Sequence, residues 1–426
     1  MNKKLLVIQA AALSRPPEVG GLAFRPIRSV LPAVTCTVQA SFRTASPPAA
    51  HGMVANGLYC RELARPMFWE QSAGLVEGER IWTRFHRAGG TVGMMFWQQS
   101  LGEDADLILS PAPIHKHHGG MIEGCYARPA DLYERLRKLV GRPFRLRHYW
   151  GPLASTKAGD WIAEATAAAL ADGSLAPDLL LTYLPTLDYD LQRFGPDGPC
   201  SDRAAAALAR QLHALLAAAE RAGYDALVFG DYAIAAVDGA VFPNRALAEA
   251  GLLATRPVGR MLYPDFHASR AVAVVDHEIA HVYVRRVEDI AEAGAVLASL
   301  DGVAEVLSRD EQSVVGLAHA NSGELVIVAD AGKWLAYPWW TARRQAPDYA
   351  THVDIHNKPG FDPCELLFER FGWPPMSTCQ NAARIRGSHG RADAARDVVW
   401  ASTLTLNTRP ADLIELAQAV RTWLNA

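Results

Sequence analysis

Two apolar runs of this chain each lead to an aspartate, and they constrain the fold more than any other feature. Residues 179–184 are followed closely by Asp188, and residues 226–230 lead directly to Asp231. Short runs rich in Leu and Val between helical stretches are typical of buried parallel strands. Because ligands bind at the carboxyl ends of such strands, the two carboxylates are placed for metal or acid–base chemistry at one shared site. The alternative is that each aspartate caps the helix that follows it.

Other segments continue this alternation of strands and helices. Further strands are predicted from apolar or extended runs at residues 5–8, 25–34, 92–97 and 398–402, and helices at 129–140, 160–170, 201–222 and 410–424. The order strand, helix, strand, helix predicts a doubly wound α/β sheet with helices on both faces.

Residues 268–330 do not follow this alternation of strands and long helices. They combine short β runs with one helical run, which predicts a small α+β insertion that does not supply the main catalytic groups. The core would then comprise residues 1–267 and 331–426. Residues 331–390 lack long periodic segments and are rich in aromatic residues, Pro and His, and so long an irregular stretch is typical of a functional region.

Composition excludes several classes of function. The formal charge is −3, with 42 basic and 45 acidic side chains and no basic stripe, which argues against a nucleic-acid-binding module. No run approaches the roughly 18 apolar residues that span a bilayer. Six scattered cysteines without zinc-ribbon spacing indicate reduced thiols in a cytoplasmic protein.

A threonine at the end of an extended run is a candidate nucleophile. The segment 31–39 reads LPAVTCTVQ, and Thr35 would open a helix there. The helix N-terminus stabilises anionic oxygens, so this is a suitable place for a hydroxyl that attacks a phosphoryl group. The alternative is that Thr35 is an N-cap and nothing more. Cys36, on the next position, should point away from the nucleophile.

The surrounding motifs resemble those of a known family. Thr35 with Thr44, Pro48, His51-Gly52 and Asn56 is similar to the nucleophile segment of the alkaline phosphatase superfamily, in its type I phosphodiesterase/nucleotide pyrophosphatase branch. Four further segments resemble that branch in the same order: YLPTLDYDLQRFGP at 183–196, Phe229 to Tyr232, SGELVIVA at 322–329 and RGSHGR at 386–391. The resemblance implies a three-layer α/β/α sandwich that carries two divalent metals, usually zinc.

The resemblance also implies roles for individual residues. Thr35 would be the nucleophile, and the candidate metal ligands are Asp188, Asp231, His389 and, as a weaker donor, Gln192. Candidate substrate-binding residues are Gln39, Asn56 and Tyr232. Four family positions differ here: a first-strand Asp falls near Ala11, two His positions fall on Gln192 and Tyr232, and an oxyanion-binding Asn falls on Val38.

A histidine from the irregular region is a further candidate metal ligand. Asp354 and His356 are two residues apart, so on a strand both would face one side. A Mg²⁺, Mn²⁺ or single-metal site could use His356 together with Asp188 and His389. The alternative is that His356 makes ordinary hydrogen bonds in a loop. His115, His117 and His118 are read as a His-rich surface loop, with a lid over the substrate as the alternative.

Two functions remain open from the sequence. The first is a hydrolase of phosphodiester, pyrophosphate or phosphomonoester bonds in a small molecule, with Thr35 as nucleophile and a divalent metal, zinc above others, as cofactor. The second is a non-hydrolytic descendant that binds a ligand or reuses the pocket without two metals. The replacements at Ala11, Gln192 and Tyr232 favour the second.

Overall fold

An eight-stranded sheet forms the centre of the part of the chain that the computed structural model describes, residues 3–117, 120–369 and 377–426. Its order is β2-β22-β11-β1-β10-β5-β6-β9. The strands are β2 (Arg25–Ile27), β22 (Val398–Ser402), β11 (Asp225–Gly230), β1 (Leu5–Ala10), β10 (Leu179–Leu184), β5 (Val92–Met95), β6 (Leu107–Pro111) and β9 (Cys125–Arg128). The five strands from β11 to β6 are parallel. Strands β22 and β9 run antiparallel to them on either side, and β2 pairs antiparallel with β22 at one edge.

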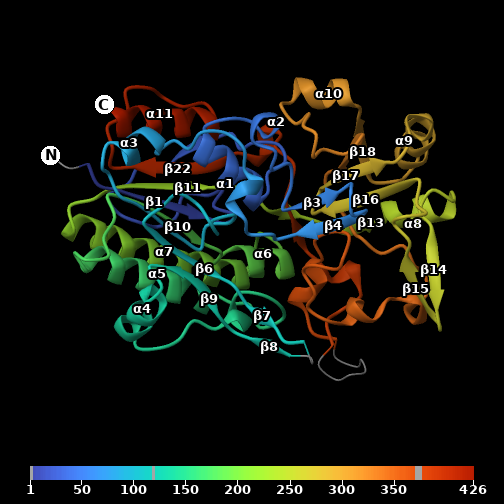
Figure 1. Ribbon diagram of the computed structural model, residues 1–426, viewed down its shortest axis with the longest axis horizontal. Helices are drawn as coiled ribbons and strands as arrows, with labels where there is room; N and C mark the ends of the chain where they lie inside the picture. Colours follow the sequence, from blue (N-terminus) through green and yellow to red (C-terminus); the bar gives the residue numbers. More distant parts are fainter. Residues whose placement is uncertain (1–2, 118–119, 370–376) are drawn as a thin grey trace.

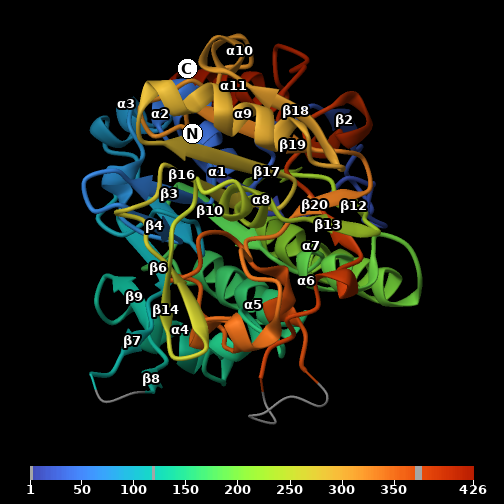
Figure 2. The ribbon, with the colours of Figure 1, turned by 90° about the vertical axis from the view of Figure 1, so that its right-hand side faces the viewer.

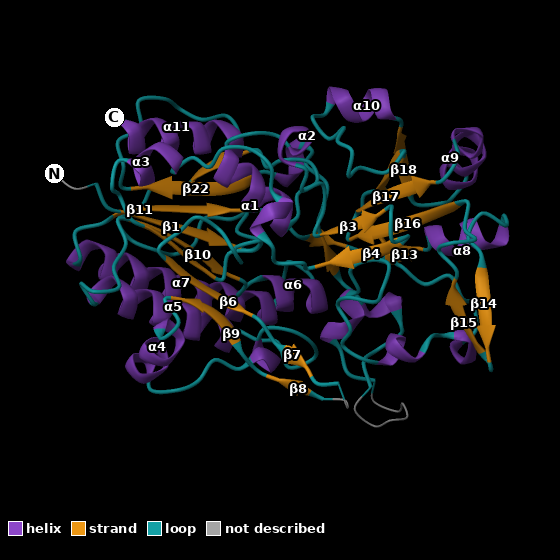
Figure 3. Ribbon diagram, viewed as in Figure 1, coloured by secondary structure: helices purple, strands orange, loops and turns teal. Residues whose placement is uncertain are grey.

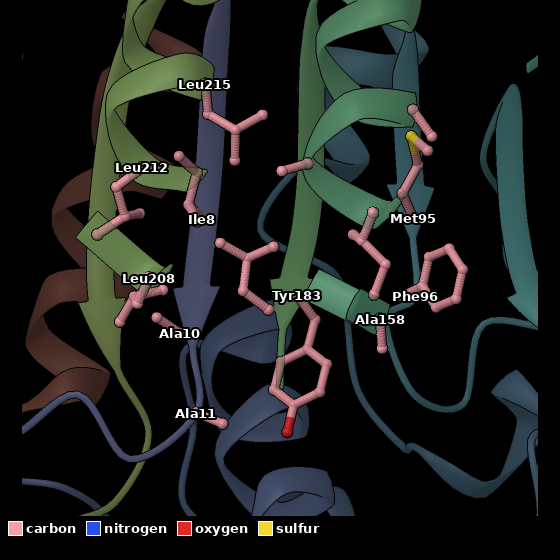
Figure 4. Close-up of a cluster of buried hydrophobic side chains, with 14 of the residues drawn as sticks. Ile8, Ala10, Ala11, Met95, Phe96, Ala158, Tyr183, Leu208, Leu212 and Leu215 are labelled. Atoms are coloured by element: carbon pink, nitrogen blue, oxygen red, sulfur yellow. The ribbon is translucent and has the colours of Figure 1, made fainter. Parts of the chain in front are cut away.

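Alternating side chains of the sheet pack into two separate cores. Leu6 and Ile8 face α5 (Lys157–Ala171) and α7 (Pro199–Arg221), where Leu208, Leu212 and Leu215 cover the sheet (Figure 4). Leu5 and Val7 face α1 (Thr35–Thr44) and α11 (Leu413–Asn425) on the other side. This period-two alternation with helices on both faces confirms the three-layer α/β/α sandwich (Figure 1).

A second sheet lies beyond the carboxyl ends of the parallel strands (Figure 3). Its order is β16-β17-β19-β18, and all its pairs are antiparallel. The elements are β16 (Ala271–Asp276), β17 (Ile279–Val284), α9 (Ile290–Ala298), β18 (Val303–Leu307), α10 (Arg309–Val314) and β19 (Leu325–Ala329). Helix α9 covers the sheet in the view of Figure 2. The division of the chain at residues 268 and 330 stays a prediction.

The remaining elements are short or connect the two sheets. The helices are α2 (Pro48–His51), α3 (Thr83–Arg87), α4 (Leu132–Val140), α6 (Asp188–Phe194) and α8 (Pro243–Glu249). The strands are β3 (Gly57–Cys60), β4 (Arg65–Phe68), β7 (Ile114–His115), β8 (Met121–Ile122), β12 (Ala235–Ala236), β13 (Gly239–Val241), β14 (Thr255–Val258), β15 (Met261–Pro264), β20 (Lys333–Leu335) and β21 (Gly387–Ser388). None of the helices in the described ranges is long and apolar enough to cross a membrane.

Candidate active site

The central parallel strands end at one level, and the predicted site residues gather there. Ala10 of β1 is in register with Leu184 of β10 and with Gly230 of β11. Thr35, Asn56, Asp188, Tyr232 and His389 line one pocket at this edge. Asp231, the residue before Tyr232, is fully buried and is not among the pocket residues. The chain segments that carry these residues span more than 350 positions, so the convergence is a property of the fold.

The Thr35 hydroxyl is not used as a helix cap. The N-cap of α1 is Val34, and Thr35 is the first residue inside the helix, so the interpretation of Thr35 as an N-cap is wrong. Thr35 Oγ1 lies 3.4 Å from the hydroxyl oxygen of Tyr183, at the end of β10. Burial raises the pKa of Tyr183 well above its usual value, so this phenol stays protonated. Cys36 faces elsewhere and accepts a hydrogen bond from Gln99.

Asp188 is held by two side-chain donors. It is the first residue of α6, whose N-cap is Leu187, so it does not cap that helix. The Tyr232 hydroxyl donates to Oδ1 at 2.8 Å, and the Gln192 amide donates to Oδ2 at 2.8 Å. Burial raises the pKa of Asp188 to about 6, against the opposing effect of these hydrogen bonds. The group therefore changes charge close to neutral pH.

His389 is packed between two rings. Its imidazole stacks on the Tyr232 ring at a centroid distance of 3.5 Å, and the His277 ring lies against it at 3.7 Å, tilted by 34°. Nδ1 donates to the Ala33 carbonyl oxygen at 2.9 Å, so Nε2 carries the lone pair and lies 3.9 Å from Asp188 Oδ1. Burial holds the pKa of His389 well below its usual value. The ring is thus a neutral acceptor beside a carboxylate.

Asp231 is bonded within the protein rather than presented to the pocket. Gln9 Nε2 donates to its Oδ2 at 2.9 Å, and the backbone amides of Ala12 and Tyr232 donate to its Oδ1. Burial raises the pKa of Asp231 to about 8. The residue that faces Asp231 from the first strand is Gln9, not Ala11. The placement of the family's first-strand aspartate near Ala11 stays a prediction.

Asn56 reaches the helix N-terminus, whereas Val38 does not. Asn56 Oδ1 accepts a hydrogen bond from the Cys36 backbone amide at 2.9 Å, and Asn56 lines the pocket. Val38 is buried in the core between α1 and the sheet. Val38 is therefore not a pocket residue, and its correspondence with the family's oxyanion-binding Asn stays a prediction. Asn56 is oriented by Asp276, which accepts from both its backbone and its side-chain amide.

The turn between β16 and β17 contributes a pocket residue that the sequence analysis did not assign to the site. Asp276 pairs with Ile279, which leaves His277 and Glu278 as a two-residue turn. His277 has φ of 63°, which is uncommon for a non-glycine residue and frequent at functional sites. It lines the pocket and stacks on Phe361 at 4.1 Å. An Asp-His-Glu sequence between two Val-rich runs is the signal that could have indicated it.

Two other predicted residues lie outside the pocket. Gln39 is buried in α1, where its side-chain oxygen accepts from the backbone amide of Gln98 at 2.6 Å. His356 is not among the pocket residues with Asp188 and His389; its Nδ1 lies 3.0 Å from the Phe68 carbonyl oxygen, as the loop interpretation expected. Its ring lies 6.1 Å from that of His115. Of the predicted His-rich loop, His118 falls outside the described residues.

The side chains at the site do not fit a divalent metal. Structural and catalytic zinc require three or four N, O or S donors around one point. No group of three or more His, Cys, Asp or Glu side chains in the described ranges is arranged to hold one. The potential ligands bond to neighbours instead: Asp231 to Gln9, Asp188 to Tyr232 and Gln192, and His389 to the backbone.

Comparisons with known proteins agree with the fold. The chain matches the family model of type I phosphodiesterase/nucleotide pyrophosphatase over residues 19–362. No curated protein matches it in sequence. Phosphonoacetate hydrolase from Sinorhizobium meliloti 1021, solved with phosphonoformate, superposes with a TM-score of 0.64 at 16% identity, over 100% of this chain and 96% of that one. Murine ectonucleotide pyrophosphatase/phosphodiesterase 5 gives 0.57 at 14%, over 99% and 95%. The human protein of that name gives 0.58 at 12%, over the same shares. The sequence match covers most of the chain, and we conclude that this protein belongs to the type I phosphodiesterase/nucleotide pyrophosphatase family.

Proposed function

We propose that this protein hydrolyses a phosphoester bond of a small molecule, with Thr35 as the nucleophile. One observation carries the proposal. The Thr35 hydroxyl lies at the N-terminus of α1 without capping the helix, and Thr35 lines one pocket with Asp188 and His389. The positive end of the helix favours the anionic oxygens of a phosphoryl group at this point. Membership of a phosphodiesterase family supports the same reaction class.

The proposed reaction has two steps. Thr35 Oγ1 attacks phosphorus, the bond to the leaving oxygen breaks, and a phosphothreonine ester forms. The Asp188–His389 pair accepts the hydroxyl proton and passes it to the leaving oxygen. Water then attacks the ester, and its proton returns to Thr35 through the same pair. Proton transfer by a positioned pair of this kind contributes about 10² to 10⁴ in rate.

The cofactor expected from the family resemblance has no part in this mechanism. The donor groups that would hold zinc are bonded to Gln9, Gln192, Tyr232 and the backbone. The proton acceptor and the phosphoryl-binding groups that we assign are all side chains or backbone of this chain. The mechanism thus differs from the metal-dependent hydrolase that the motifs suggest.

The pocket is small and partly open to solvent. The space within it is about 70 Å³, well below the roughly 300 Å³ at which pockets for drug-sized ligands begin. We propose that this space takes the phosphoryl group and that the substituents of a larger ester extend toward the open side. We also propose that the protein works in the cytoplasm, which the six cysteines, all described and all free, support.

A non-hydrolytic function is the second candidate. Two hydrogen bonds favour it, from Gln9 to Asp231 and from Tyr232 to Asp188. They satisfy carboxylates that a metal-dependent hydrolase would leave free to bind its ions. Such a protein would bind the same small ligand without turning it over.

Single-turnover chemistry separates the two candidates. The purified protein is incubated with bis(para-nitrophenyl) phosphate in the presence of a chelator, and release of nitrophenol is followed with mass spectrometry of the peptide that carries Thr35. A burst of nitrophenol with a phosphoryl adduct on Thr35 supports the hydrolase. Binding of the ester with neither product would contradict it and favour the binding protein.

A further inference from the structure

The charge of the pocket points to a second feature of its ligand. Three carboxylates line the pocket, those of Asp188, Asp362 and Glu365. Within the described part of the chain, no lysine or arginine does so. A pocket that recognised only a phosphate dianion would carry the opposite balance, because arginine and lysine are the usual phosphate-binding side chains. The pocket therefore suits a ligand with a positive group.

A buried lysine offsets part of this negative charge but does not reach the ligand. Lys358 is 1% exposed, and its Nζ lies 2.8 Å from Asp362 Oδ2 and 2.5 Å from Glu365 Oε1. Glu365 Oε1 also accepts from the backbone of Asp354. Glu365 Oε2 takes part in no hydrogen bond or ion pair with the described residues, and Glu365 lines the pocket. When all three are ionised, the carboxylates of Asp188, Asp362 and Glu365 outnumber the single positive charge of Lys358.

Aromatic rings make up much of the remaining wall. Trp69, Tyr149, Trp150, Tyr189, Tyr232 and Phe361 line the pocket. Trp150 lies 5.5 Å from Tyr149, and Phe361 lies 6.3 Å from Trp69. Aromatic rings attract cations through their quadrupoles, most strongly where water is excluded, and such ring clusters are the usual binding sites of ammonium groups.

An unused acceptor supports the same conclusion independently. His277 is 3% exposed, and its Nδ1 lies 2.7 Å from Asp276 Oδ1. Nδ1 donates to this carboxylate, so in the neutral ring Nε2 carries the lone pair. His277 lines the pocket, and its buried Nε2 has no hydrogen-bond partner among the described residues. A buried acceptor without a donor is costly, and a ligand N–H would satisfy it.

From these observations we propose that the pocket binds an organic ammonium group, held by the carboxylates of Glu365 and Asp188, the wall rings and His277. This inference rests on the proposed function in one respect: the substrate would be a phosphoester of an amino alcohol, with phosphorus at Thr35 and the ammonium toward Glu365. The binding of the ammonium group itself does not depend on hydrolysis.

Calorimetric titration of the full chain tests the proposal. Methylammonium and tetramethylammonium chlorides are titrated at constant ionic strength against tert-butanol, a neutral molecule of similar shape. We expect at least one of the two cations to bind about tenfold or more tightly than the alcohol, as a desolvated cation–aromatic contact predicts. Equal or weaker binding of both cations would overturn the proposal.

Variants connect the binding to the named residues. Glu365→Gln keeps the acceptor for Lys358 but removes the charge, and it should weaken cation binding about tenfold. Asp197→Asn is the matched control, because it removes one carboxylate that is 72% exposed and outside the pocket. If Glu365→Gln does not fold, Trp150→Ala at the wall serves instead. Unchanged affinity in the folded variant would overturn the assignment.

A last variant distinguishes this proposal from the proposed function. Thr35→Ala should lose hydrolysis and retain the cation affinity. If Thr35→Ala still hydrolyses the ester and cation binding is intact, only the role of Thr35 is contradicted. Hydrolysis without cation binding in the unaltered protein would contradict the ammonium site alone.

Discussion

The side-chain amide of Gln9 donates a 2.9 Å hydrogen bond to Oδ2 of Asp231. Gln9 lies on β1 and Asp231 follows β11, the neighbouring parallel strand, so the bond joins the carboxyl ends of two central strands. Two carboxylates at these positions would repel each other unless a cation lay between them. A neutral amide donor satisfies Asp231 with no cation, and the pair is the clearest difference between this site and a metal centre.

Restoring metal ligands should create zinc affinity. We expect the unaltered protein to purify without stoichiometric zinc and to keep its activity after chelation. The triple variant Gln9→Asp, Gln192→His and Tyr232→His supplies a charged or imidazole ligand at each altered position, and it should bind zinc in about equimolar amount. Elemental analysis after dialysis measures both quantities.

The control for the triple variant is Gln9→Asn combined with the same two histidines. It keeps an amide opposite Asp231 and should gain less zinc. Stoichiometric zinc in the unaltered protein would contradict our account of the site.

Thr35 should be essential for turnover if the proposed function is correct. Thr35→Ala is expected to lower kcat/KM for an aryl phosphodiester by about 10³-fold or more, because it removes the nucleophile. Thr35→Ser retains a hydroxyl and should keep measurable activity. The two rates, compared at equal protein stability, test the assignment. Equal rates in the alanine and serine variants would remove Thr35 from the mechanism.

The rate should depend on the ionisation of Asp188. Its pKa is raised from 3.8 to about 6, so the carboxylate that serves as proton acceptor is lost as the pH falls through 6. We expect kcat/KM to fall on the acid side with this midpoint. A pH–rate profile of Asp188→Asn measures the contribution: its residual rate should be lower by about 10² or more and independent of pH near 6. A profile unchanged by the substitution would assign the midpoint to another group.

Buried carboxyls should also make the protein less stable as the pH rises. The pKa of Asp231 is raised from 3.8 to about 8, so the folded state holds this proton more tightly than the unfolded state. The stabilisation is complete below pH 3.8 and is lost as the pH rises through 8. One such group changes the unfolding constant by at most about tenfold per pH unit. Denaturant titrations between pH 3.8 and 8 measure this effect. The free energy of unfolding should depend less steeply on pH in Asp231→Asn than in the unaltered protein.

Local sequence patterns were sufficient to predict the fold. The runs around residues 5–8, 179–184 and 226–230 form neighbouring strands, because short apolar runs between helices have few other ways to be buried. Helix α7 (Pro199–Arg221) lies within two residues of its prediction at 201–222. The position of Thr35 and Asp188 at one edge follows from the same rule, since parallel strands end together.

The partners of the site residues could not be predicted in the same way. Gln9 meets Asp231 across two strands, and His277 reaches the pocket from a turn of the second sheet, 112 positions before His389, on which it stacks. The first contact depends on which strands are neighbours in the central sheet, and the second depends on how the two sheets are placed. No local pattern contains either. Motif spacing alone placed the family aspartate near Ala11, two positions beyond the side chain that faces Asp231.

Lys358 should be the most sensitive charged position beside the pocket. It is buried and bonded to Asp362, Glu365 and the His352 carbonyl oxygen. Lys358→Met would leave two buried carboxylates without their cation, which typically costs about 3–5 kcal/mol in the free energy of unfolding. Urea titration measures this loss.

Adding Glu365→Gln and Asp362→Asn to Lys358→Met removes the uncompensated charges, so the triple variant should recover much of the stability. Lys333→Met, which breaks a solvent-exposed ion pair with Asp238, is the control and should leave the stability almost unchanged. A Lys358→Met protein as stable as this control would mean that water reaches the two carboxylates and that the pocket is more open than the structure indicates.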